Sequence, residues 1–148
     1  MPLPPLPESA VVLDATAADW RAAVTLVGEA LAASGAATPA YGGEMVRMIE
    51  EHGPYVVIAP GLALAHARPG PEVRADGLAV VTLATPIEFG HPYNDPVRVV
   101  LGLAITRGGD HLGAVAAVAN VFNDSDAVEQ LATAATVQDV RRIMGADR

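Results

Sequence analysis

Four histidines are the residues of this chain best suited to chemistry. The sequence has no cysteine, which excludes a thiolate nucleophile, a disulfide and a cysteine ligand for zinc. All 9 basic residues are arginine, so no lysine can form a Schiff base or bind the phosphates of a nucleotide. Ser9, Ser34 and Ser125 fall in a proline-rich tail, at a helix end and in a turn, where serine is common. We therefore expect any covalent chemistry to use a histidine or a carboxylate.

Two of the histidines follow predicted strands. His66 lies among small residues between Gly61 and Pro69, and Arg68 comes two positions later. The carboxyl end of a strand is where open α/β sheets bind their ligands. His111 follows a Gly-Gly loop and falls in the first turn of a predicted helix, where free N–H groups and the helix dipole favour a phosphate. The same dipole disfavours imidazolium and would keep His111 neutral.

Each histidine also has an ordinary structural explanation. His52 falls at the C-terminal end of a predicted helix, where an imidazolium suits the dipole, and we interpret it as a capping residue. His91 lies in the polar loop 90–96 and is interpreted as a turn residue. On the same reasoning, His66 would be a loop histidine bonded to backbone carbonyls, and His111 a solvent-facing residue at a helix start.

The alternative is that His66 and His111 work as a pair. If the strands before them run parallel and adjacent, both imidazoles meet at one edge of the sheet. One could then be a nucleophile and the other a donor to an anionic intermediate. A neutral imidazole can attack a phosphoryl group near neutral pH, so such a carrier needs neither a metal nor a nucleotide. Metal binding is the other use of a histidine pair, but the sequence has no H-E-x-x-H motif. We therefore expect no cofactor and no metal.

Hydrophobic spacing and cap residues predict the elements that position these histidines. The first helix is bounded by Thr16 with Asp19 and by Ser34–Gly35, and the second by Thr38–Pro39 and Gly53–Pro54. Strands are predicted over residues 55–59, 78–83 with a short piece at 87–89, and 97–105, the last as the central strand. Three helices follow, capped by Asp110, Ser125 and Thr136, the first of them with Leu112, Val115, Ala119 and Phe122 facing the core. Two helices, several strands and three helices indicate an α/β fold in which helices flank a mixed sheet.

The length of 148 residues indicates one domain over residues 11–148, preceded by a flexible proline-rich segment over residues 1–10. The net charge of -8 argues against nucleic acid or an anionic membrane as partner. No apolar run is long enough to cross a bilayer, and the N-terminus lacks a signal peptide, so we expect a cytoplasmic protein without membrane insertion. Alanine-rich helix faces would permit close packing, and a dimer is compatible with the sequence.

Residues 52–69, HGPYVVIAPGLALAHARP, resemble the active-site segment of IIA components of the phosphoenolpyruvate-dependent sugar phosphotransferase system. Within that system they are most similar to the ascorbate-type branch of the mannitol/fructose IIA superfamily. The resemblance covers residues 16–144. Its further matches are Leu78–Leu83 with Pro86 and Phe89, Asn94–Val97, and His111 followed by Val121–Phe122.

The resemblance implies a mixed sheet of about five strands with helices on both faces, and a phosphorelay function. His66 matches the histidine that accepts phosphate from the carrier HPr and passes it to a cysteine of a IIB partner. His111 matches the second active-site histidine, which contacts the phosphoryl group. Arg68 lies in the motif, and we infer that it pairs with phosphate. The chain has no IIB or membrane IIC segment, so those partners would be separate proteins.

One position departs from the family. Proline usually precedes the phosphorylated histidine, and this chain has Ala65 there. Proline would fix φ and stiffen the backbone, so alanine leaves the histidine less pre-organised. The departure keeps open an alternative function, a regulatory IIA-like module that controls a partner through its phosphorylation state. The transported substrate, for which ascorbate or a related carbohydrate is the expectation, is not determined by a IIA domain.

Overall fold

The computed structural model describes residues 3–106, 108–124 and 126–145, with side chains omitted for residues 108–110. Its centre is a five-stranded mixed sheet in the order β1-β4-β5-β3-β2. The strands are β1 (Val11–Ala15), β4 (Gly77–Ile87), β5 (Val97–Ala104), β3 (Leu62–His66) and β2 (Val57–Ala59). β5 is parallel to β3 and antiparallel to β4, while β1 is parallel to β4 and β2 is antiparallel to β3. The predicted mixed sheet is confirmed, and β5 is its central strand.

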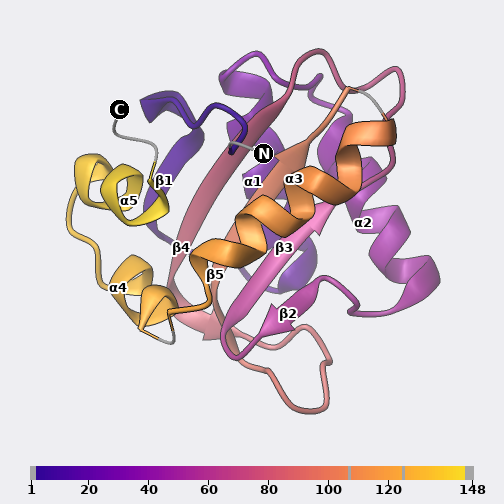
Figure 1. Cartoon of the computed structure of the whole chain (residues 1–148). Helices are drawn as coiled ribbons and strands as arrows, with labels where there is room; N and C mark the ends of the chain where they lie inside the picture. The colour runs from indigo at the N-terminus through magenta and orange to yellow at the C-terminus, as the bar shows by residue number, and fades with distance from the viewer. Residues whose placement is uncertain (1–2, 107, 125, 146–148) are drawn as a thin grey trace.

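Helices cover both faces of this sheet, as predicted. They are the short 3₁₀ helix η1 (Glu8–Ala10), α1 (Trp20–Ala33), α2 (Tyr41–His52), α3 (Gly108–Val121), α4 (Ala127–Ala132) and α5 (Val137–Met144). In Figure 1, α1 lies behind the sheet and α3 crosses in front of it. Among the described residues, no helix is both long enough and apolar enough to span a bilayer.

The first two helices lie near their predicted positions, but both start later. The side chain of Asp19 accepts the backbone N–H of Ala22 at 2.9 Å, so Asp19, and not Thr16, is the N-cap of α1. Thr38 precedes α2 in a turn in which its carbonyl accepts the N–H of Tyr41, and its hydroxyl binds the carboxylate of Glu72. Both C-terminal boundaries are confirmed, since Ser34 is the C-cap of α1 and Gly53 that of α2.

The predicted order of elements is wrong at its beginning, because β1 precedes both helices. β1 is a short edge strand beside β4, and Val11 is its only buried residue. A strand this short, with one buried side chain, shows little hydrophobic periodicity in its sequence. The missed strand β3 has the sequence LALAH, and alanine and leucine have weak strand propensity. β4 runs without a break through residues 84–86, which the prediction left between two separate pieces, and its register is irregular between Thr82 and Ile87.

Residues 1–10 were predicted to be flexible. The described part of this segment, residues 3–10, packs against the sheet. Leu6 is buried. The N–H of Leu78 donates to the carbonyl of Pro5 at 2.9 Å, and Nε of Arg141 donates to the carbonyl of Leu6 at 2.9 Å. Residues 3–10 therefore contact both β4 and α5.

The helices after β5 agree only in part with the prediction. α3 begins at Gly108, so Asp110 lies inside its first turn and does not precede it as a cap. Of the predicted inward face, Val115 and Phe122 pack against the core, while Leu112 is 80% exposed and Ala119 is exposed. Ala114 and Val118 are fully buried, so the predicted face is only partly right. Thr136 caps α5 by accepting the N–H of Asp139, as predicted, while Ser125 lies outside the described residues.

Candidate functional site

The structure brings His66 and His111 together at one edge of the sheet. His66 is the last residue of β3, and the parallel ladder between β3 and β5 ends where it pairs with Leu103. β5 then leads into α3, whose first turn carries His111. The centroids of the two imidazole rings are 5.2 Å apart, and their planes are inclined by 50°. The parallel, adjacent strands on which the pairing hypothesis depended are therefore present.

The pleat of β3 determines the face on which His66 lies. A Cβ atom on Gly102 would lie 2.8 Å from Cγ2 of Val27, so this position of β5 faces α1. Ala65 is the ladder partner of Gly102 and faces the same way. Because side chains alternate along a strand, His66 points to the opposite face, the one crossed by α3 in Figure 1. A small residue at position 65 thus lies under α1 while its neighbour His66 faces His111.

A backbone carbonyl defines the tautomer of His66. Nδ1 of His66 lies 2.9 Å from the carbonyl oxygen of Leu64. Since a carbonyl can only accept, Nδ1 carries the hydrogen, and the lone pair of the neutral ring is on Nε2. Burial lowers the pKa of His66, the Leu64 carbonyl opposes this, and the charge of His111 lowers the pKa further. Burial and the charge of His111 both favour the neutral imidazole, whose lone pair on Nε2 makes it a candidate nucleophile.

His111, whose ring lies next to that of His66, has a polar atom without a hydrogen-bond partner among the described residues. Within the part of the chain that the structure describes, Nδ1 of His111 is buried and has no hydrogen-bond partner. Buried polar atoms without partners are rare in folded proteins, and those at functional sites are often completed by a ligand. The arrangement suits a group that binds His111 and His66 at once.

All three residues singled out by the sequence line one cavity of about 390 Å³. Its lining consists of Met48, His52, Tyr55, His66, Ala67, Arg68 and His111. Arg68 is exposed, and no hydrogen bond or ion pair joins it to another described residue. Its guanidinium is therefore available to an anion in this cavity. The described residues contain no cluster of three or more acidic or histidine side chains that could hold a metal ion.

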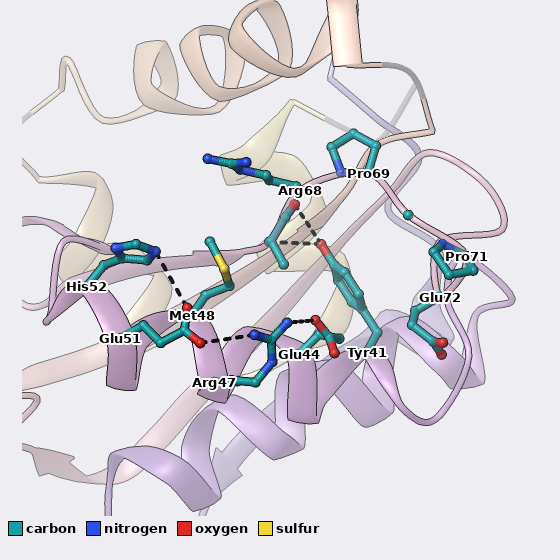
Figure 2. Close-up of a pocket in the computed structure, with 12 residues that line it drawn as sticks. Tyr41, Glu44, Arg47, Met48, Glu51, His52, Arg68, Pro69, Pro71 and Glu72 are labelled. Atoms are coloured by element: carbon teal, nitrogen blue, oxygen red, sulfur yellow. Dashed lines mark hydrogen bonds and ion pairs between the residues drawn. The ribbon is translucent and has the colours of Figure 1, made fainter.

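A second cavity of about 440 Å³ adjoins the first and shares four of its lining residues, Met48, His52, Ala67 and Arg68. It extends along α2 past Tyr41 to Pro69 and Glu72 (Figure 2). Arg47 lies at its side and is paired with Glu44 and Glu51. Arg68 is therefore the cation of this region that has no carboxylate partner among the described residues.

Two aromatic residues of the site were missed by sequence reasoning. The ring of Tyr55 stands perpendicular to that of His66, with centroids 5.7 Å apart, and its hydroxyl lies 3.4 Å from the carbonyl oxygen of His66. On the side of His52, the centroids of the His52 and Tyr55 rings are 6.3 Å apart. His52 does end α2 as predicted, but its ring lines the cavity. Its position 14 residues before His66 gave no periodic signal, since a turn and an edge strand lie between them.

His91 lies apart from this site and acts as a turn residue, as predicted. Its Nδ1 accepts the backbone N–H groups of Tyr93 and Asn94 at 3.1 and 3.0 Å. In the same loop, Oδ2 of Asp95 accepts three further N–H groups, from residues 89, 90 and 91. Both side chains therefore organise the loop before β5.

Comparisons with known proteins match nearly the whole chain. Residues 5–146 match the family model described as phosphoenolpyruvate-dependent sugar phosphotransferase system, EIIA 2. The ascorbate-specific PTS system EIIA component of Escherichia coli (strain K12) is 36% identical over 129 residues, which cover 86% of this chain and 84% of that protein.

Solved structures show the same fold. A PTS IIA protein from Streptococcus mutans superposes with a TM-score of 0.83 at 31% identity, covering 95% of this chain and 89% of that one. The complex of enzyme IIAMtl with phosphorylated enzyme IIBMtl from Escherichia coli gives a TM-score of 0.78 at 23% identity, with 93% and 94% coverage, a likeness of fold alone.

Proposed function

Because this chain belongs to the EIIA 2 family of the phosphoenolpyruvate-dependent sugar phosphotransferase system, we propose that His66 is the residue on which it carries the phosphoryl group. The protein is a phosphotransferase component, and its family's chemistry requires a side chain that accepts and releases phosphate. The observation that carries the assignment is the 2.9 Å contact between Nδ1 of His66 and the Leu64 carbonyl, which leaves the lone pair on Nε2 of a ring that neighbours His111.

The acceptance step needs no proton transfer at His66. The lone pair of Nε2 attacks phosphorus, a new N–P bond forms, and the N–P bond on the donor histidine breaks as the donor nitrogen takes back its electron pair. The His66 ring becomes cationic while Nδ1 keeps its hydrogen. The Leu64 carbonyl then accepts a charge-assisted hydrogen bond, which is stronger than the one made to the neutral ring. Release reverses these steps when the next acceptor attacks phosphorus.

His111 and Arg68 stabilise the transferred group. Negative charge spreads over the phosphoryl oxygens during transfer, and donors placed beforehand around that charge lower the barrier. His111 is the neighbour of His66 with an unpartnered nitrogen, and Arg68 lines the same cavity. We assign His111 as a donor to the phosphoryl oxygens and Arg68 as a charge partner for phosphate.

The proposed donor is the phosphocarrier HPr, and the proposed acceptor is a cysteine on a separate IIB protein. The absence of cysteine from this chain agrees with a thiol on the partner, and the IIA–IIB complex of similar fold supports a IIB partner. The names of the relatives support ascorbate as the substrate of a membrane IIC component. In this scheme the relay operates in the cytoplasm.

The test is a reconstituted relay with phosphoenolpyruvate, enzyme I and HPr, in which acid-labile phosphate on this protein is measured. Wild type should take up phosphate, His66→Ala should not, and His91→Ala should match wild type because His91 only organises a loop. Addition of an ascorbate-type IIB should then remove the label. If the wild type keeps its phosphate in the presence of the ascorbate-type IIB but loses it to a mannitol-type IIB, the ascorbate assignment is contradicted.

A further inference from the structure

Tyr41, the first residue of α2, is a buried tyrosine whose hydroxyl lies at the C-terminal end of β3, the strand that carries His66. The hydroxyl is 2.8 Å from the carbonyl oxygen of Leu103 and 3.5 Å from that of Ala67, and it accepts the N–H of Ala67 at 3.1 Å. Its single hydrogen goes to the nearer carbonyl, that of Leu103. Figure 2 shows the Tyr41 ring reaching from α2 to the chain that continues into Arg68 and Pro69.

The hydrogen bonds of the Tyr41 hydroxyl join the backbone of the two strands where the β3–β5 pairing ends. The β3–β5 pairing ends at His66 and Leu103. The Tyr41 hydroxyl binds the carbonyl of that same Leu103 and the N–H of Ala67, the residue that follows His66. One side chain therefore joins the backbone just beyond the candidate nucleophile to the strand that leads to His111.

We propose that Tyr41 is a positioning residue for phosphoryl transfer, whose hydroxyl holds the backbone after His66 against β5 and thereby keeps the His66 imidazole in its place next to His111. This inference rests on the proposed function of His66. Tyr41 does not line the cavity that contains His66 and His111, so it acts through the backbone of Ala67. Small displacements of reacting groups lower the reaction rate steeply, so a contact that fixes the backbone next to His66 can have a large effect on the rate of phosphoryl transfer.

The protonation state of Tyr41 supports this role. Burial raises the pKa of Tyr41 to about 12, and the hydrogen bond from Ala67 only partly opposes that effect. The hydroxyl therefore keeps its hydrogen throughout the pH range in which the histidines titrate. The hydroxyl can therefore donate to the Leu103 carbonyl whether His66 is neutral, protonated or phosphorylated.

Thr82 provides a matched control for the loss of this hydroxyl. Thr82 is buried in β4, and its hydroxyl accepts the N–H of Asp14 at 2.8 Å in the edge strand β1. Tyr41→Phe and Thr82→Val each remove one buried hydroxyl with little change of shape, and each leaves a backbone N–H without its acceptor. Both should lower stability, but only Tyr41→Phe should disturb His66.

The experiment measures transfer rates and imidazole NMR signals in wild type, Tyr41→Phe and Thr82→Val, at a temperature at which all three are folded. Tyr41→Phe should slow phosphoryl transfer from HPr by about tenfold to a hundredfold, shift the ¹⁵N signals of His66 and move its pKa toward the ordinary value. Thr82→Val should keep the wild-type rate and signals. If Tyr41→Phe does not fold, the pair is compared in a Gly43→Ala background, since position 43 has open space for a Cβ atom.

Equal rates and equal His66 signals in the two variants would overturn the proposal. A slower rate in Tyr41→Phe with unchanged His66 signals would also overturn it, because the effect would then not pass through that imidazole. If wild type takes up no phosphate, the proposed function fails, and the His66 signals alone decide whether Tyr41 positions the ring.

Discussion

The imidazoles of His66 and His111 lie with their centroids 5.2 Å apart, one at the end of β3 and the other in the first turn of α3. The parallel pairing of β3 with β5 produces this proximity, because the chain leaves both strands at the same edge of the sheet. The Leu64 carbonyl then binds Nδ1, which leaves the lone pair on Nε2 of His66, the nucleophile that we propose. Strand direction, pleat and one backbone hydrogen bond thus assemble the site.

The first prediction concerns the stability of the protein as the pH falls through 6.5, the ordinary pKa of histidine. The pKa of His66 in the folded protein is lowered below its ordinary value of 6.5, mainly by burial. Below that ordinary value the unfolded chain binds the proton more readily, so the free energy of unfolding should fall as the pH drops from 6.5 toward the folded pKa. Urea unfolding at several pH values should show a shallower slope in His66→Gln. An identical slope in the variant would contradict the lowered pKa.

The second prediction separates acceptance from transfer. His111→Ala should still take up phosphate on His66, because Nε2 is untouched, but the rate of transfer should fall by about a hundredfold with the loss of a donor to the phosphoryl oxygens. The pKa of His66 should also rise, since His111 contributes to its lowering. Rapid-quench kinetics and NMR titration measure the two effects, with His91→Ala as control. Unchanged transfer kinetics would remove His111 from the mechanism.

The third prediction concerns the ring of Tyr55, which packs perpendicular to His66. Tyr55→Ala should open the imidazole to water and raise the pKa of His66 toward its ordinary value. Tyr55→Phe keeps the ring and loses only a hydroxyl 3.4 Å from the His66 carbonyl, so the pKa should stay near that of wild type. NMR titration of His66 distinguishes the variants. Equal shifts in both would mean that the ring does not shield the imidazole.

The fourth prediction concerns the contact between α1 and α2, the helix that carries Tyr41 and His52. A Cβ atom on Gly28 would lie 2.5 Å from Cα of Gly42, whereas one on Gly43 would meet nothing within 4 Å. Gly28→Ala should lower the free energy of unfolding by about 1–3 kcal/mol. Gly43→Ala should leave it unchanged or raise it by up to about 1 kcal/mol, because alanine favours the helix. Denaturant unfolding of both variants measures this, and equal stabilities would refute the close helix contact.

Much of the site could be predicted from sequence because the signals were local. The helix stop at Gly53, the central strand and the small residues around His66 each follow from residue type and spacing. The proximity of His66 and His111 required one further condition, parallel and adjacent strands, which the structure supplies. The resemblance of residues 52–69 to IIA proteins supplied the roles.

The remainder depended on tertiary contacts. β3 was missed because its alanines derive their strand conformation from pairing on both sides and from burial beneath α1. The face of α3 was misjudged at Leu112, where apolar type alone did not predict exposure. The Tyr41 hydroxyl reaches residues 26 and 62 positions away in the chain, a distance that no local pattern encodes.

The most direct test of the account is to identify the phosphorylated atom. Wild-type protein labelled with ¹⁵N in its histidines is phosphorylated by phosphoenolpyruvate, enzyme I and HPr and examined by ³¹P and ¹⁵N NMR. We predict phosphorus bonded to Nε2 of His66, with Nδ1 still protonated and bound to Leu64. Phosphorus on Nδ1, phosphorus on another histidine, or equal labelling of His66→Ala would contradict it.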